Sequence, residues 1–143
     1  MHFRCLSGLL IIIPFFSYAG GMGCAATGAA IEQQLFDSIT DGLNIPPDTI
    51  VRNKTIVTVL NTSPVSELFA SQLADEDSDN NGAKLPKGEY FDSYYGNGAK
   101  NITAKYTYTN HDNKKDVFIA SGLVNNDECS VRFNGYLIIS REF

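Results

Sequence analysis

The C-terminal third of the chain most constrains its fold, because three strand-like runs follow one another there. Residues 102–109 alternate between apolar or aromatic side chains on one face and threonine or lysine on the other, the period-two pattern of a half-buried strand. Residues 117–124 are more uniformly apolar, which favours a central strand covered on both faces. Residues 131–139 alternate again around Gly135, a candidate bulge, and are expected to bury four side chains: Val131, Phe133, Leu137 and Ile139. Polar turns between the runs predict an antiparallel meander.

A helix and a strand are predicted upstream of this meander. Residues 29–43 carry apolar side chains at spacings of three and four, which indicates one buried helical stripe. The polar side chains between them are expected to face solvent: Glu32, Gln33, Gln34 and Asp37. Two segments, residues 50–51 and 55–60, are rich in β-branched side chains and predict a first strand.

A second helix is expected to begin near residue 64. Ser63 is a candidate N-cap, and Pro64 suits the first helical position because its missing N–H is not needed there. The buried face of this helix is expected to comprise Val65, Leu68, Phe69 and Leu73. The polar residues 75–82 then predict a long loop, and residues 90–95 predict a strand that forms a hairpin with residues 102–109.

Together these elements predict an α+β fold in a single domain at residues 29–143. About two helices are expected on one face of a mainly antiparallel five-stranded sheet that ends in the C-terminal β-meander. A β-sandwich is the alternative if either helix is absent.

The N-terminus has the features of an export signal. A short apolar run at residues 9–16 follows Arg4, and small residues precede Gly20, so residues 1–19 predict a cleaved signal peptide. The run is shorter than the roughly 20 residues of a membrane span, so no integral span is expected after cleavage. Residues 20–28 are glycine-rich and predict a flexible leader. The residues before Cys24 do not fit a lipid-attachment motif, and we therefore expect a periplasmic or secreted protein without a lipid anchor.

Cysteine usage agrees with export. Cys5 lies in the predicted signal peptide, which leaves Cys24 and Cys129 as an even pair. We expect an intramolecular disulfide between them. Neither cysteine lies in a C-x-x-C motif or near clustered histidines, so the pair does not suggest a metal site.

The negative charge of the chain restricts its partners. The formal net charge is −5, and an acidic domain repels phosphate backbones, which argues against nucleic-acid binding.

One segment partly matches a calcium-binding loop. Residues 77–82 fit the pattern D-x-D-x-N-G, which can direct the oxygens of Asp77, Asp79 and Asn81 towards one hard cation. The twelfth position is Gly88 rather than an acidic residue, so only half of the loop pattern is present. The alternative is a solvated acidic loop. No cofactor is expected otherwise.

A second segment, residues 89–95, mixes aromatic and acidic side chains. Tyrosine offers rigid contact area with a polar tip, so this segment is a candidate for contact with a protein partner or a glycan. The candidate residues are Tyr90, Asp92, Tyr94 and Tyr95. The alternative is a strand that buries one of its aromatic faces.

No catalytic motif accompanies these features. His111 is the only histidine outside the predicted signal peptide and lies in a polar turn. We therefore expect a non-enzymatic binding protein that acts through protein–protein interaction with an envelope or surface component. An accessory factor of a bacterial surface or secretion system, or an inhibitor, would fit. A calcium- or glycan-binding module is the alternative, and a carboxylate-dependent hydrolase is the third hypothesis.

Overall fold

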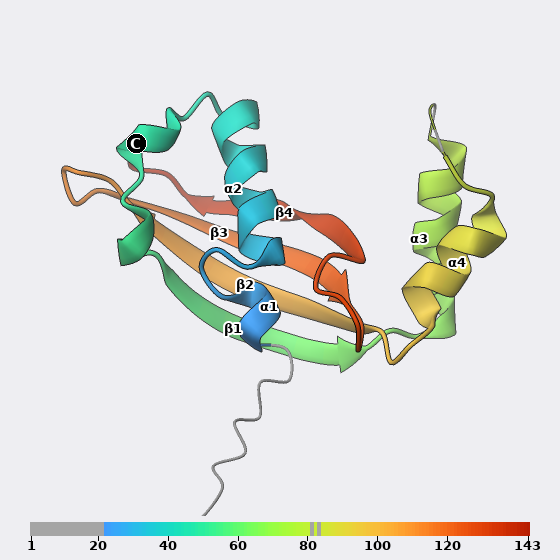
Figure 1. Ribbon diagram of the computed structural model, residues 1–143. Helices are drawn as coiled ribbons and strands as arrows, with labels where there is room; N and C mark the ends of the chain where they lie inside the picture. Colours follow the sequence, from blue (N-terminus) through green and yellow to red (C-terminus); the bar gives the residue numbers. More distant parts are fainter. Residues whose placement is uncertain (1–21, 81, 83) are drawn as a thin grey trace, which may run out of the picture.

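The computed structural model describes residues 22–80, 82 and 84–143, and within them the chain forms one four-stranded antiparallel sheet (Figure 1). The strands are β1 (Ile56–Pro64), β2 (Lys100–Thr109), β3 (Lys115–Val124) and β4 (Arg132–Ser140). They lie in the order β1-β2-β3-β4, so each strand pairs with its neighbour in sequence. The predicted C-terminal meander is therefore confirmed.

One face of the sheet is covered by the helix α2 (Ala30–Gly42), which crosses it in Figure 1. The predicted helix at residues 29–43 is thus confirmed, and the α+β class with it. The face of β2 that was expected to be buried forms part of the core between the sheet and α2. The aromatic rings of this core pack edge to face with one another, an arrangement that suits the quadrupoles of the rings. The largest fully buried apolar side chains of this core are Ile31, Leu35, Ile39, Ile102, Tyr106, Tyr108 and Phe118.

Glu32 on α2 was expected to face solvent, and this prediction is wrong. Its side chain is fully buried and forms an ion pair with Arg52, which belongs to the short helix η2 (Arg52–Lys54). The Tyr108 hydroxyl donates to the Glu32 carboxylate at 2.9 Å, and the backbone N–H of Gly28 donates to it at 2.7 Å. A buried carboxylate is tolerated here because each of its oxygens is hydrogen-bonded.

The predicted leader at residues 20–28 is partly helical in the structure. Met22–Ala25 forms α1, Ala25 is buried, and the Tyr106 hydroxyl donates to the Ala25 carbonyl at 2.9 Å. Cys24 forms a disulfide with Cys129, with the two Cα atoms 5.2 Å apart, so the predicted pairing is confirmed. The predicted signal peptide at residues 1–19 lies outside the described residues.

Residues 61–95 differ most from the prediction. β1 begins at Ile56 and continues through residues 61–64, beyond the predicted end of the strand at residue 60, so neither Ser63 nor Pro64 starts a helix. The N-cap is Ser66, whose hydroxyl accepts from the Phe69 N–H at 3.2 Å. The helix α3 (Glu67–Asp79) then runs through most of the predicted acidic loop, and residues 90–95 lie in the helix α4 (Lys87–Tyr95) instead of a strand.

These differences change the layer arrangement. The sheet has four strands because the predicted fifth is helical, and the described residues contain no second sheet that would make a β-sandwich. The predicted helices do not share one face: α2 covers the sheet, whereas α3 and α4 lie side by side beyond one end of the strands (Figure 1).

β4 is an edge strand of the sheet, because it pairs with β3 alone. Leu137 and Ile139 were expected to be buried but are 65% and 53% exposed, so this part of the prediction is wrong. Val131 and Phe133 are half-buried. The predicted bulge is confirmed, because the β3–β4 register shifts between Ser121 and Gly122, opposite residues 133–135, and Gly135 has a φ of +99°.

Candidate interaction surfaces

The helices α3 and α4, with the residues that join them, form a unit that we call the helical hairpin. It has its own small core, which includes Leu73 and Ala74 of α3 and Tyr94 of α4 and reaches Leu123 of the sheet. Along α4 the aromatic rings stack in pairs one helical turn apart: Tyr90 with Tyr94, and Phe91 with Tyr95, with centroids 5.9 and 5.4 Å apart.

A polar network joins this hairpin to the sheet. Arg132 at the start of β4 donates from Nε and Nη2 to the two carboxylate oxygens of Asp77, at 2.6 and 2.8 Å. The Tyr94 hydroxyl donates to the same carboxylate at 2.6 Å, and the Arg132 guanidinium lies 5.8 Å from the centre of the Tyr94 ring. These contacts orient α3 and α4 on the end of the sheet.

The network shifts the protonation equilibria of its members. The hydrogen bonds from Arg132 hold the pKa of Asp77 below its ordinary value of 3.8, against the opposing effect of burial. Burial, reinforced by the Asp77 carboxylate, raises the pKa of Tyr94. At neutral pH the network therefore consists of a carboxylate, a guanidinium and a neutral phenol.

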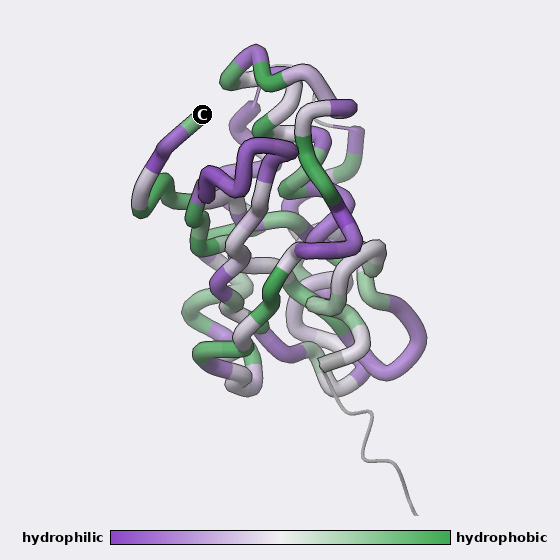
Figure 2. The backbone as a smooth tube through the Cα atoms, turned by 90° about the vertical axis from the view of Figure 1, so that its left-hand side faces the viewer, coloured by the Kyte–Doolittle hydropathy of each residue, from purple (hydrophilic) through white to green (hydrophobic). Residues whose placement is uncertain are grey.

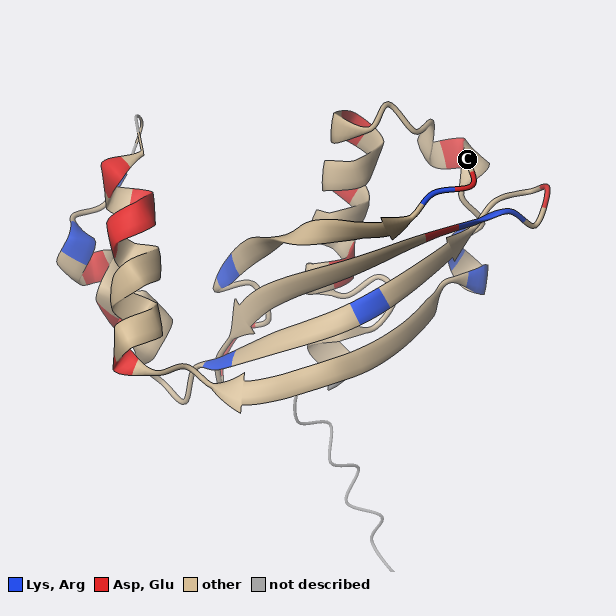
Figure 3. Cartoon of the chain, turned by 180° about the vertical axis from the view of Figure 1, so that it is seen from behind, with Lys and Arg blue, Asp and Glu red and all other residues tan. Residues whose placement is uncertain are grey.

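Charge is unevenly divided between the hairpin and the rest of the chain. Residues 67–95 hold seven of the 16 acidic residues and two of the 11 basic residues, a net charge of −5. Nine residues of each sign remain elsewhere, so the rest of the chain is neutral overall. Figure 3 shows several acidic residues on α3 and α4, with others spread over the rest of the chain.

The hairpin also exposes apolar side chains. Leu68, which was expected to be buried, is 71% exposed on the first turn of α3, next to a shallow hollow lined by Ser66, Glu67 and Ser71. Tyr95 at the end of α4 is 46% exposed. These two exposed side chains are therefore candidates for contact with a partner.

The four residues predicted to contact a partner lie on α4 but do not share one surface. Tyr94 is buried in the hairpin core and bonded to Asp77, and Tyr90 is half-buried. Asp92 and Tyr95 are exposed. A helix turns successive side chains by about 100°, so Asp92, which a strand would place on the same face as Tyr90 and Tyr94, lies on another side of α4.

The candidate calcium ligands are arranged differently from a calcium loop. Asp77 and Asp79 lie on the last turn of α3, and Asn81 lies outside the described residues. The Asp77 carboxylate is bonded to Arg132 and Tyr94, so a cation there would compete with a bound guanidinium. Among the described residues, no cluster of three or more His, Cys, Asp or Glu side chains is placed to hold a metal ion.

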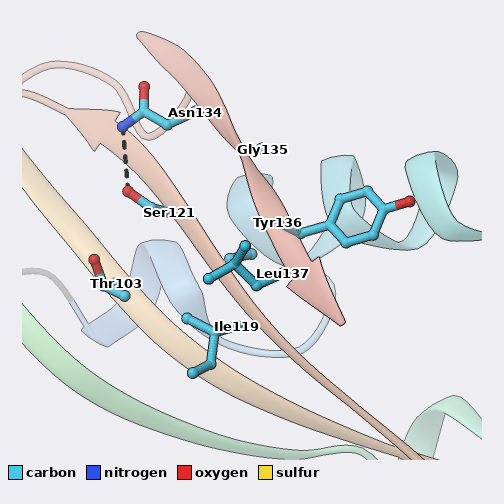
Figure 4. A pocket seen from close by; sticks show the side chains of 8 residues that line it. Thr103, Ile119, Ser121, Asn134, Gly135, Tyr136 and Leu137 are labelled. Carbon is cyan, nitrogen blue, oxygen red and sulfur yellow. Dashed lines mark hydrogen bonds between the residues drawn. The ribbon is translucent and has the colours of Figure 1, made fainter. Parts of the chain in front are cut away.

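The second candidate surface is the face of the sheet opposite α2. A hollow of about 220 Å³ lies on it between β2, β3 and β4, with Thr103, Ile119 and Leu137 among its lining residues (Figure 4). Its polar groups bond to each other: the Asn134 amide donates to Ser121 Oγ at 3.2 Å and to Asn101 Oδ1 at 3.0 Å. The hollow is smaller than typical small-molecule sites of roughly 300–1,000 Å³.

The edge strand β4 borders this face and adds an exposed apolar segment. Leu137, Ile138 and Ile139 are consecutive, and each is about half exposed or more. In Figure 2 the chain, traced back from its C-terminus, passes from hydrophilic residues into a green hydrophobic stretch. The alternation rule assigned Leu137 and Ile139 to the core, because an apolar run in a strand ordinarily indicates burial.

His111 lies in the turn between β2 and β3. Its side chain is exposed, and its Nε2 atom is 3.0 Å from the Asp48 carbonyl oxygen.

No helix within the described residues is long and apolar enough to cross a membrane. Comparison of the chain with models of protein families, with curated proteins and with solved structures finds no match.

Proposed function

We propose that this chain is an exported, non-enzymatic binding protein that acts through protein–protein contact, with the helical hairpin as the contact element. The observation that carries the proposal is that exposed Leu68 and Tyr95 lie on an element with a net charge of −5. Such a surface suits a partner with a basic face and apolar contact points. A periplasmic or secreted accessory factor of a bacterial surface or secretion system, or an inhibitor, fits this description.

The charge distribution and the apolar side chains have separate physical roles in this proposal. A concentrated negative charge steers a basic partner towards the hairpin and speeds association. Buried leucine and tyrosine side chains at the centre of a contact then slow dissociation. The Arg132–Asp77–Tyr94 network supports both roles, because it holds the hairpin in one orientation before the partner arrives.

The test is a binding experiment with matched variants. The purified protein is immobilised, exposed to an envelope extract, and the retained proteins are quantified at increasing salt concentrations. Leu68→Asp and Tyr95→Ser should lose retention of a basic protein that the wild type holds, and salt should weaken the wild-type interaction. Leu137→Asp serves as the control, because Leu137 is similarly exposed but lies on β4. Equal retention by Leu68→Asp, Tyr95→Ser and the wild type would refute the hairpin as the contact element.

The calcium- or glycan-binding and hydrolase hypotheses remain predictions from the sequence. The contacts of Asp77 with Arg132 and Tyr94 give us reason to rank the calcium hypothesis below protein binding.

A further inference from the structure

The outer edge of β4 leaves backbone groups without partners. β4 pairs with β3 on one side only and is the last strand of the sheet. Among the described residues, the backbone of residues 135–140 makes no hydrogen bond on its other side. An edge strand therefore presents a row of N–H and C=O groups that another extended strand can pair with.

β4 lacks several features by which proteins protect such an edge. Residues 133–140 contain no charged residue and no proline, and the exposed side chains at 137–139 are all apolar. The opposite edge differs: β1 ends in Pro64, which cannot donate a hydrogen bond, and α1 packs against it. Of the two edges, β4 is therefore the more open to strand addition.

We propose that β4 pairs antiparallel with β4 of a second copy of this chain, which joins two sheets into one of eight strands. A two-fold axis at Ile138 would place the two Ile138 residues opposite each other and Leu137 of each copy opposite Ile139 of the other, so that the apolar segments of the two copies meet. The paired segments carry no charge, and no like charges face each other across them.

The charge distribution favours a second copy at this edge. The helical hairpin, with its net charge of −5, lies at the end of the sheet where β4 begins, because Arg132 bonds to Asp77 there. Figure 1 shows the hairpin beyond one end of the strands, so an antiparallel pair would hold its two hairpins at opposite ends of the joined sheet. The two copies therefore meet through the neutral part of the chain, and their acidic hairpins are kept apart.

Analytical ultracentrifugation of the purified chain over a range of concentrations tests this inference. The wild type should show a dimer whose population rises with concentration. Ile138→Lys should reduce the dimer at least tenfold at equal concentration, because it places two like charges at the axis. Leu60→Lys is the matched control, because Leu60 is 50% exposed on β1 and Ile138 is 49% exposed on β4; it should dimerise as the wild type does.

Hydrogen exchange distinguishes strand pairing from other contacts. Amides of residues 135–140 that face outward should exchange more slowly as the concentration rises, whereas stacking of two open sheet faces would leave their exchange unchanged. If Ile138→Lys fails to fold, judged by circular dichroism, Leu137→Lys replaces it. A wild type that is monomeric at every concentration, or a dimer with unprotected β4 amides, would overturn the inference. Leu68→Asp should leave the dimer intact, which separates this result from the outcome of the hairpin experiment.

Discussion

Arg132 and Asp77 are 55 positions apart in the chain, yet two hydrogen bonds of 2.6 and 2.8 Å join the guanidinium of one to the carboxylate of the other. The Asp77 side chain is 21% exposed and that of Arg132 13%, so solvent screens this pair less than it screens a surface ion pair. The pair links the start of β4 to α3 and sets the position of the helical hairpin on the sheet.

This pair predicts an acid-dependent contribution to stability. Because Arg132 holds the pKa of Asp77 below 3.8 in the folded state, the contribution is present above about pH 4 and is lost as the pH falls through the folded-state pKa. Asp77→Asn should lower the free energy of unfolding by about 1–2 kcal/mol at pH 7. The difference from wild type should narrow below about pH 4. Urea denaturation at several pH values measures this difference in the free energy of unfolding. Asp79→Asn is the control, because Asp79 lies on the same turn but is exposed, and it should have little effect on the free energy of unfolding.

The buried Glu32 predicts a large difference between two substitutions. Glu32→Ala removes the partner of Arg52 and of the Tyr108 hydroxyl, and should cost about 3–5 kcal/mol of unfolding free energy. Glu32→Gln retains an acceptor for Tyr108 and should cost less. Chemical denaturation of both variants measures the difference. Equal stability of Glu32→Ala and wild type would show that the buried network is not stabilising.

The disulfide predicts a dependence of stability on oxidation. It joins residues 105 positions apart, and chain entropy assigns a loop of that length roughly 4–5 kcal/mol. The double variant Cys24→Ser with Cys129→Ser should lose most of that free energy of unfolding. The wild type should fall to the same value in a reducing agent, and the double variant should be insensitive to it. A wild type whose midpoint does not move on reduction would contradict this.

The tyrosines predict behaviour at alkaline pH. Burial raises the pKa values of Tyr106 and Tyr108 well above the ordinary 10, and the Glu32 carboxylate adds to both shifts. Tyr94 is shifted in the same direction by burial and Asp77. These phenols stay protonated in the folded state while the unfolded chain loses its protons above pH 10, so stability should fall as the pH rises above that value. Phenolate absorbance should therefore show three tyrosines that ionise only together with unfolding, which circular dichroism monitors.

Local patterns predicted some elements well and others poorly. The period-two run in β2 and the apolar stripe of α2 are long enough that only one secondary structure satisfies each of them. The run at residues 90–95 is too short to distinguish a strand from a helix. Its aromatic residues recur at spacing four, which places them on one side of either a strand or a helix, and the core shared with α3 decides for the helix.

The candidate site depended on contacts that no local pattern contains. The Asp77–Arg132 pair and the burial of Glu32 each need two segments that are far apart in the chain. The exposure of Leu137 depends on which face of the sheet is covered: α2 covers one face, and Leu137 lies on the other.

The sequence by itself determined the α+β class, the helix on the sheet, the order of the last three strands and the pairing of Cys24 with Cys129. These follow from periodicity, turn residues and an even number of cysteines, which act over short distances or leave one arrangement. Only the tertiary structure decided that α3 and α4 form a separate acidic hairpin and that β4 is an open edge. The physical reason is that the burial of a side chain depends on which distant segment covers it.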